Sequence, residues 1–344
     1  LLQSSAASDV YKRQGVGNIV FMDDIFMTKN KLTNIGFPKK QGLYDSNKEH
    51  DSCGVGLIAD INNEASHDIV KKGLAMLCNL EHRGAVGADP KAGDGSGILI
   101  QIPHNFLVKE VKNINLPEKN NYGVGVFFIK KDNRVKEAIF KLIEEICQKE
   151  KVPFLGWREC PTYGDELGWS VKPTIPLVYH LFVGKPENIY HQDDWERKIY
   201  VLRQCIDKAV AQMGDQYYDQ FYIPSFSSRT ILYKGMVLSD QVGTVGNQLG
   251  FFEDLSDPMI ESSFALIHQR FSTNTFPTWS LAQPFRMLCH NGEINTVRGN
   301  INWMNARHSI LKSDKFSTDI DKIWPIIKAV YYTHLRAHET SIDL

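Results

Sequence analysis

The sequence has 344 residues, 42% of them hydrophobic and 23% charged, which is the balance of a globular protein with one large domain or two small ones. Lys and Arg total 39 and Asp and Glu total 40, so the charge favours neither a nucleic acid nor an anionic membrane as partner. No apolar run reaches about 18 residues and no secretory signal is evident. We therefore expect a protein of the cytoplasm, or of a plastid if the source is a photosynthetic eukaryote.

Both ends of the sequence differ in character from the rest. Residues 1–14 have neither helical nor strand periodicity, and residues 331–344 break abruptly from the pattern before them. Both resemble translated sequencing artefacts, and we exclude them from the prediction of the fold. The predicted organisation is a leader over 1–52, one domain over 53–330 and a foreign tail over 331–344.

The periodicity of apolar residues predicts clusters of antiparallel strands with helices between them, which is the α+β class. Strands are predicted at 54–60, 98–102, 122–130, 174–183, 230–238, 264–269 and 285–290. Helices are predicted from a cap at Ser66 or Asp68 to about residue 80, from a cap at Asp132 to about residue 149, over 194–213 and over 294–311. Residues 87–97 are dense in glycine and predict tight turns; no lysine or helix follows them as a phosphate-binding loop requires.

The six cysteines are widely scattered and contain no C-x-x-C pair, so the sequence predicts no metal site. They are Cys53, Cys78, Cys147, Cys160, Cys205 and Cys289. A disulfide framework is not expected in a chain of this length, which favours a reducing compartment. Most of these thiols are expected to be small core residues.

Cys53 stands where a polar segment without periodicity, 44–52, gives way to the first predicted strand. Removal of the leader would make Cys53 the first residue and free its α-amino group. That amine has a pKa of about 7.7–8.0 and an ordinary thiol one of about 8.5, so a single residue would hold a nucleophile and a matched general base. The alternative is a buried small residue in a Cys-Gly pair.

Two later stretches have the residue types of an acyl-transfer site. Arg270 follows a predicted strand, and a guanidinium there can bind a substrate carboxylate through two hydrogen bonds; the alternative is a surface arginine in a polar loop. In the stretch His290-Asn291-Gly292-Glu293, the Asn291 amide and the Gly292 N–H can supply two donors for an oxyanion. The alternative there is an ordinary Asn-Gly turn.

Taken together, C-G-V-G, HQRFSTNT and HNGEINT resemble a class II (N-terminal nucleophile) glutamine amidotransferase. Six blocks in the family order resemble more narrowly the glutaminase domain of the glutamate synthase family, from about residue 43 to about residue 328. They are LEHRGAVGAD, GDGSGILIQIPHNF, LGWRECP, SSRTILYKGM, HQRFSTNTFPTW and HNGEINTVRGNINWM. The resemblance implies a four-layer αββα sandwich with two antiparallel sheets between helical layers.

The resemblance also implies a role for each matching residue. Cys53 would be the nucleophile and its freed amine the base, and Asn291 with Gly292 would form the oxyanion hole. Arg270 would hold the carboxylate of L-glutamine, with Thr273 binding the same ligand. Arg83, in the H-R-G segment, would support the nucleophile.

Other parts of the family pattern lie beyond this sequence. The family's aspartate for the glutamine amino group, in a Gly-Ser-Asp-Ser stretch, is expected shortly after residues resembling 319–328, where the sequence turns foreign. No cofactor is expected in this region. In the full-length family, FMN and an iron–sulfur cluster serve the amination of 2-oxoglutarate, with ferredoxin, a small subunit or a nicotinamide cofactor supplying electrons.

Three rival interpretations remain open at this point. Another class II amidotransferase is disfavoured by the long insert between Gly97 and Phe264. A non-catalytic relic that acts only by binding is disfavoured by the set of Cys53, Arg270 and Asn291. A papain-like hydrolase would need a His–Asn pair that we do not identify.

Overall fold

The computed structural model describes residues 40–42, 54–81, 84, 88–246, 248–269, 277–286 and 297–326. The chain divides into two compact units, Leu1–Asp51 and Ser52–Leu344. Of the first unit only residues 40–42 are described. Every element named below belongs to the second unit.

Two four-stranded antiparallel sheets form the centre of the second unit. In spatial order the first sheet contains β1 (Val55–Ala59), β8 (Phe264–Gln269), β2 (Ser96–Gln101) and β7 (Thr230–Gly235). The second contains β4 (Phe154–Glu159), β5 (Leu177–Gly184), β3 (Tyr122–Ile129) and β6 (Tyr222–Ser227). The first and last strands of the described residues meet in the first sheet, because β1 pairs with β8.

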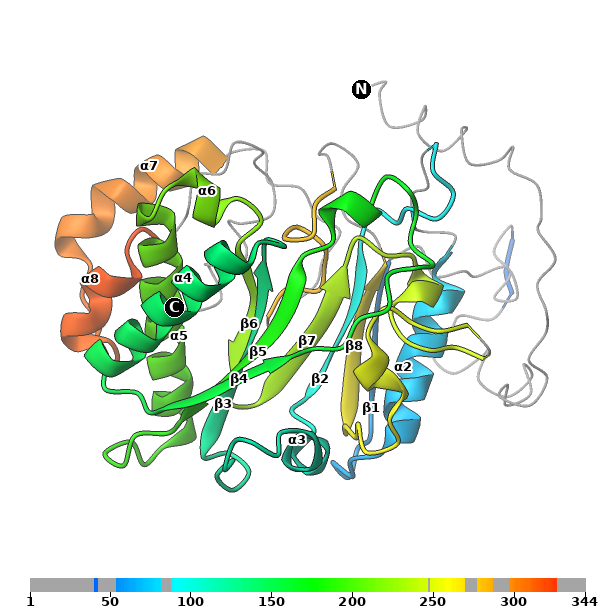
Figure 1. Ribbon diagram of the computed structural model, residues 1–344, viewed down its shortest axis with the longest axis horizontal. Coiled ribbons are helices and arrows are strands. Elements are labelled where there is room, and N and C mark those ends of the chain that lie inside the picture. The colour runs from blue at the N-terminus through cyan, green and yellow to red at the C-terminus, as the bar shows by residue number, and fades with distance from the viewer. Residues whose placement is uncertain are drawn as a thin grey trace. The chain divides into compact units, whose positions relative to one another are not determined.

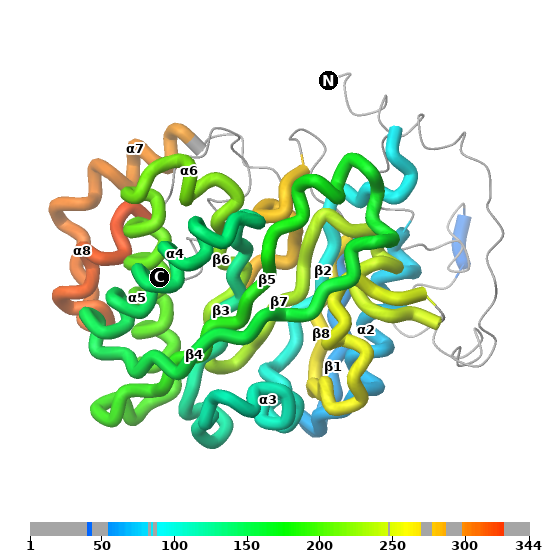
Figure 2. The backbone as a smooth tube through the Cα atoms, in the orientation of Figure 1, coloured from blue at the N-terminus to red at the C-terminus, as the bar shows by residue number. Residues whose placement is uncertain are grey.

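Helices cover both outer faces of the paired sheets. The long helices are α2 (His67–Asn79), α4 (Asn133–Lys149) and α5 (Gln192–Gln212); the shorter ones are α3 (His104–Glu110), α6 (Asp215–Tyr218), α7 (Val297–Arg307) and α8 (Ile320–Ile323). Helix α2 lies on the first sheet, and α4 and α5 lie at the opposite side, on the second (Figure 1). Figure 2 shows the same succession in the backbone trace. The expected αββα order is confirmed.

Helix α2 begins where the sequence predicted and packs closely on β8. Ser66 is its N-cap, and the Ser66 hydroxyl accepts a hydrogen bond from the Ile69 N–H at 3.4 Å. A Cβ atom on Gly73 would lie 2.7 Å from the Ala265 Cβ and 3.1 Å from the Ile98 Cδ1. The glycine in the middle of the helix therefore allows the helix to approach the sheet more closely than any larger residue would.

Helices α4 and α5 bury apolar stripes against the second sheet. Asp132 caps α4 by accepting from the N–H groups of Arg134 and Val135 at 2.8 and 3.2 Å. Helix α5 buries Ile199, Leu202, Ile206 and Val210, which recur at helical spacing. In the part of the chain that the structure describes, no helix combines the length and apolar composition that a bilayer crossing requires.

The sequence did not predict the two edge strands of the second sheet, and both are irregular. Strand β4 contains Gly156, which has a φ of 145° and lies at a shift of register against β5. Strand β6 contains Pro224, which an edge position tolerates because no partner needs its missing N–H. Of the strand predicted at 285–290, residues 285 and 286 are not in a strand, and the rest lie outside the described residues.

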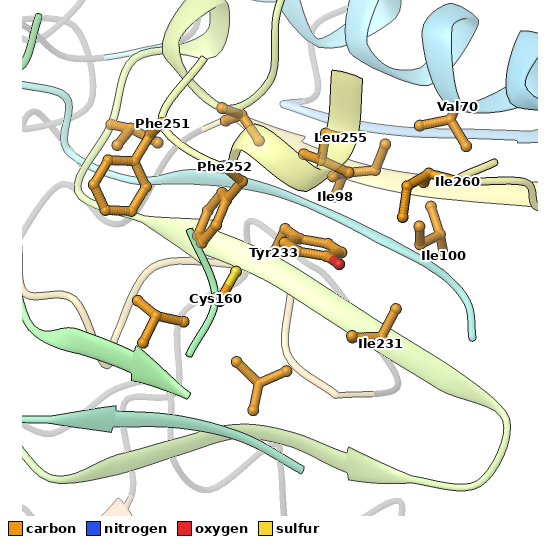
Figure 3. Packing of buried hydrophobic residues seen from close by; sticks show 14 of the residues in the cluster. Val70, Ile98, Ile100, Cys160, Ile231, Tyr233, Phe251, Phe252, Leu255 and Ile260 are labelled. Carbon is orange, nitrogen blue, oxygen red and sulfur yellow. The ribbon is translucent and has the colours of Figure 1, made fainter. Parts of the chain in front are cut away.

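A central cluster of buried apolar residues is shared by α2, both sheets and the loop after β7. Figure 3 shows part of it: Ile231 and Tyr233 of β7, Ile98 and Ile100 of β2, Val70 of α2, and Phe251, Phe252, Leu255 and Ile260 of the loop. Cys160, which follows β4, also points into this cluster. The cluster joins α2, both sheets and the segment after β7, so folding of these elements is expected to be cooperative.

A buried ion pair lies within the central cluster. The Arg158 guanidinium donates to both oxygens of Asp254, at 2.8 Å to Oδ2 and 2.7 Å to Oδ1, and the two side chains are only 10% and 2% exposed. The Tyr233 hydroxyl and the Cys160 thiol also donate to Oδ2, at 3.3 and 3.6 Å. This pair links β4 to the segment after β7. If either partner were lost, the other would remain as an uncompensated charge in apolar surroundings.

Cys160, His180 and Asp254 are the one group of metal-ligating side chains that lie together among the described residues, with ligand atoms within 4.8 Å of one another. Both carboxylate oxygens of Asp254 already accept hydrogen bonds from Arg158. The positive guanidinium beside the carboxylate opposes a cation at the same place. This group is therefore an ion-pair network and does not have the form of a metal centre.

Replacing Asp254 by Asn should destabilise the protein by about 3–5 kcal/mol, because Arg158 then keeps a buried charge without its counter-charge. Urea denaturation followed by circular dichroism measures this change. The double variant Arg158→Met, Asp254→Leu should lose less than Asp254→Asn alone, since it leaves no buried charge. Asp68→Asn is the matched control at the exposed pair with Lys72, where the loss should stay below about 1 kcal/mol. A loss below about 1 kcal/mol for Asp254→Asn would contradict this role.

His180 makes stability depend on pH. Burial lowers the pKa of His180 from 6.5 to about 4; Asp254 opposes that shift and Arg158 adds to it. The Arg158 guanidinium can only donate, so the His180 Nδ1 accepts from it at 3.3 Å, and the ring is neutral. Between about pH 6.5 and pH 4 the unfolded chain binds a proton that the folded chain does not bind.

The free energy of unfolding should therefore fall by about 2 kcal/mol through this residue as the pH falls from 7 to 5. Urea denaturation at these two pH values measures the decrease. In His180→Gln the free energy of unfolding should fall by about 2 kcal/mol less than in the wild type over the same pH range. An equal decrease in the variant and the wild type would show that His180 is not its source.

Candidate functional site

All six candidate site residues lie outside the described residues: Cys53, Arg83, Arg270, Thr273, Asn291 and Gly292. The undescribed stretches that contain them are bounded by residues that the structure describes, such as Gly54, Gly84, Gln269 and Arg286. The flanking residues show where in the fold the corresponding chain segments begin and end.

Gly54 and Gln269, the described neighbours of Cys53 and Arg270, lie side by side at one end of the first sheet. Gly54, which follows Cys53, accepts a hydrogen bond on its carbonyl oxygen from the Gln269 N–H at 2.7 Å. Gln269 is the last residue of β8, and Arg270 follows it. The antiparallel register, with Val55 opposite His268, brings the start of β1 to the end of β8.

Gly84, the described neighbour of Arg83, lies at the same end of the sheet. Helix α2 ends at Asn79, and after it the Gly84 N–H donates to the Glu81 carbonyl at 2.9 Å. A Cβ atom on Gly84 would overlap the Nε2 atom of Gln269. Gly84 therefore lies directly against the side chain that precedes Arg270.

One residue further into the sheet, a row of paired residues crosses all four strands. Val55 lies opposite His268, His268 opposite Gly97, and Gly97 opposite Lys234. A Cβ atom on Gly97 would lie 2.6 Å from the Lys234 Cβ and 2.7 Å from the Tyr233 carbonyl oxygen, so β2 and β7 approach closely here because of the glycine. The glycine-dense block that the sequence marked thus serves the packing of this end of the sheet.

Lys234 connects this row to the segment that precedes Asn291 and Gly292. Its side chain is fully buried, and its ammonium group donates to the Ser280 carbonyl at 3.0 Å. The ammonium also lies 4.7 Å from the ring centre of Tyr222 and 4.6 Å from that of Phe285. Phe285 comes shortly before the undescribed stretch 287–296. One described flank of each of the four site segments therefore contacts a residue at this end of the first sheet: Gly54 and Gly84 contact Gln269, and Phe285 contacts Lys234.

The four cysteines within the described residues are unsuited to nucleophilic chemistry. Burial raises the pKa of Cys78 and of Cys147 to about 12, and it also raises those of Cys160 and Cys205. A thiol whose pKa is raised holds less thiolate at neutral pH than an ordinary cysteine does. These four residues act as small packing groups, as the sequence predicted for most of the cysteines.

Two polar residues at this end of the sheet were not singled out from the sequence. Lys234 interrupts the apolar run TILYKGM, and Gln269 follows the run FALIH. A single polar residue inside a predicted strand was the available signal, but periodicity alone does not tell whether such a residue faces solvent. Both are buried, Lys234 at 0% and Gln269 at 1% exposure.

Comparison with known proteins shows the family of this chain. Residues 53–332 match the family described as glutamine amidotransferases class-II. The chain is 46% identical over 303 residues to "Glutamate synthase (NADPH) large chain" of Bacillus subtilis, covering 88% of this chain and 19% of that protein. It is 41% identical over 304 residues to "Glutamate synthase (NADH)" of Saccharomyces cerevisiae, covering 85% of this chain and 14% of that protein. It is 40% identical over 283 residues to "Ferredoxin-dependent glutamate synthase 2" of Synechocystis, covering 81% of this chain and 17% of that protein.

The chain thus spans less than a fifth of the length of these relatives. The family match begins at Cys53 and includes each of the six candidate site residues. The chain belongs to the class II glutamine amidotransferases, and the part matched is the amidotransferase region of glutamate synthases.

Proposed function

We propose that this chain hydrolyses L-glutamine to L-glutamate and ammonia through a thioester on Cys53. The observation that carries the proposal is the hydrogen bond from the Gln269 N–H to the Gly54 carbonyl, which joins the segments of Cys53 and Arg270 at one end of a sheet. Gly84 against the Gln269 side chain and Phe285 against Lys234 support it, because they bring in the other two segments. Membership of the family supports the same reaction.

The mechanism starts with the free α-amine of Cys53, which takes the proton of the thiol. The sulfur forms a bond to the amide carbon of the glutamine side chain, and the carbonyl electrons move to its oxygen. The Asn291 amide and the Gly292 N–H donate to that oxyanion. The protonated amine then gives its proton to the nitrogen, the carbon–nitrogen bond breaks and ammonia leaves. Water attacks the thioester by the same proton transfers and releases glutamate.

Recognition of the substrate falls to the segment after β8. Arg270 would bind the α-carboxylate through two parallel N–H donors, and the Thr273 hydroxyl would bind the same ligand. Arg83 would support the nucleophile from the loop after α2. These assignments rest on the position of each residue within the family motifs, together with the convergence of the described flanks.

For the whole protein, of which this chain matches a minor part, we propose that the ammonia aminates 2-oxoglutarate. The relatives' names mention NADPH, NADH and ferredoxin, so the electron donor of this protein is one of those classes. FMN and an iron–sulfur cluster would be held elsewhere in the protein, as the family resemblance implies. A cytoplasmic or plastid location suits this role.

Freeing the amine of Cys53 should switch the activity on. We compare the full chain with the chain that begins at Cys53, measuring glutamate released from glutamine. The full chain should be slower by a factor of at least about 10³, because it lacks the general base and is blocked at its nucleophile. Cys53→Ser in the shorter chain should lose a similar factor while its circular dichroism stays unchanged. Equal activity of the full chain and the shorter chain would contradict the mechanism.

Arg270→Lys should raise the KM for glutamine about 10-fold or more, because a lysine loses one of the two charged hydrogen bonds to the carboxylate. The kcat should change less, since the reacting amide is remote from the carboxylate. Steady-state kinetics on the chain that begins at Cys53 measures both constants. Arg229→Lys, at an exposed ion pair with Asp193, is the control and should leave both constants unchanged. An unchanged KM in Arg270→Lys would remove this role from Arg270.

A further inference from the structure

Gln269 is a polar residue in an apolar position. Along β8 the face that packs under α2 carries Ala265 and Ile267, and Gln269 is the next residue on that face. Its side chain is 1% exposed, and its Oε1 atom has no hydrogen-bond partner among the described residues. A buried acceptor without a partner costs about 1–3 kcal/mol, so a methionine or leucine would be the more stable choice for packing alone.

Gln269 lies between the first residue of the described β1 segment and the loop after α2. Its backbone N–H is bound to the Gly54 carbonyl at 2.7 Å, and its Nε2 occupies the space where a side chain on Gly84 would be. A Cβ atom on Gly84 would also lie 3.3 Å from the Glu81 carbonyl oxygen, so the closest contact that a larger residue would make at position 84 is with the Gln269 carboxamide. The carboxamide therefore fills a gap between the end of β8 and the loop after α2.

Three of the proposed site residues are direct sequence neighbours of this contact. Cys53 precedes Gly54, Arg83 precedes Gly84 and Arg270 follows Gln269. We propose that Gln269 is a positioning residue of the amidotransferase site, whose carboxamide fixes the loop of Arg83 against the paired strands that lead to Cys53. This inference rests on the proposed function. It adds Gln269 to the proposed site as a residue that acts through Arg83 and Cys53.

A double-mutant cycle on the chain that begins at Cys53 tests the proposal. Gly84→Ala should lower kcat/KM for glutamine by about 10- to 100-fold, because the new methyl group displaces the carboxamide and shifts the loop. Gln269→Ala should lower it by a similar factor. The double variant should be no slower than Gln269→Ala, because the clash is then gone. Losses that multiply in the double variant would overturn the proposal.

A second variant separates positioning from filling of space. Gln269→Met keeps the size of the side chain and removes its hydrogen-bonding groups, and its kcat should fall about 10-fold or more with a KM within about threefold of the wild type. Wild-type kcat in Gln269→Met would overturn the proposal. A raised KM with unchanged kcat would also overturn it, because the residue would then act through Arg270 on substrate binding.

Gln204 of α5 supplies the matched control. It is 2% exposed, and its Oε1 likewise has no partner among the described residues, but it lies on the helix at the far side of the second sheet. Gln204→Met should leave kcat and KM within about twofold of the wild type. Equal losses in Gln204→Met and Gln269→Met would show a general effect of stability and overturn the proposal.

The two levels of inference fail in different ways. If the wild-type chain hydrolyses glutamine but the losses multiply in the double variant, the role of Gln269 is removed and the proposed function stays in place. No glutamine hydrolysis by the wild-type chain beginning at Cys53 removes the proposed function and the role of Gln269 with it.

Discussion

The pairing of β1 with β8 is the constraint on which the candidate site depends. These are the first and last strands of the described residues, and their register places Val55 opposite His268 and Gly54 beside Gln269. A shift by one residue would turn every side chain of β1 to the other face of the sheet. Helix α2 opposes such a shift, because Gly73 lets it pack tightly on Ala265 of β8. The same packing brings the end of α2, and with it Gly84, to the end of β8.

Buried polar groups divide between two tasks in this unit. The Arg158–Asp254 pair lies in the central cluster and connects β4 to the segment after β7, so its role is to hold the fold together. Lys234 and Gln269 lie at the end of the first sheet and contact the segments that flank the candidate residues. Buried polar side chains such as Lys234 and Gln269 stabilise the fold less than apolar side chains of the same size would. A lower stability of this kind is expected at residues that serve a reaction.

The sequence was most informative where local rules decide the structure. Ser66, one of the two caps predicted for α2, and Asp132, predicted for α4, accept the expected backbone hydrogen bonds, because a cap depends on residues within one turn. Strands β4 and β6 escaped prediction because Gly156 and Pro224 break their patterns at sheet edges, a position that only the tertiary structure reveals. The candidate residues came from motifs, whereas Gln269 became visible only through the register of β8 and the return of the chain at Gly84. No local pattern distinguishes a buried glutamine in a strand from an exposed one.

The most direct measurement of the central claim is a crystal structure of the chain beginning at Cys53 after reaction with a diazoketone analogue of glutamine. The account predicts a thioether on the Cys53 sulfur, the analogue's carboxylate on the Arg270 guanidinium, and its ketone oxygen within about 3 Å of the Asn291 amide nitrogen and the Gly292 nitrogen. A Cys53 sulfur that stays unmodified, or that lies on the opposite face of the sheet from Arg270 and Asn291, would contradict it.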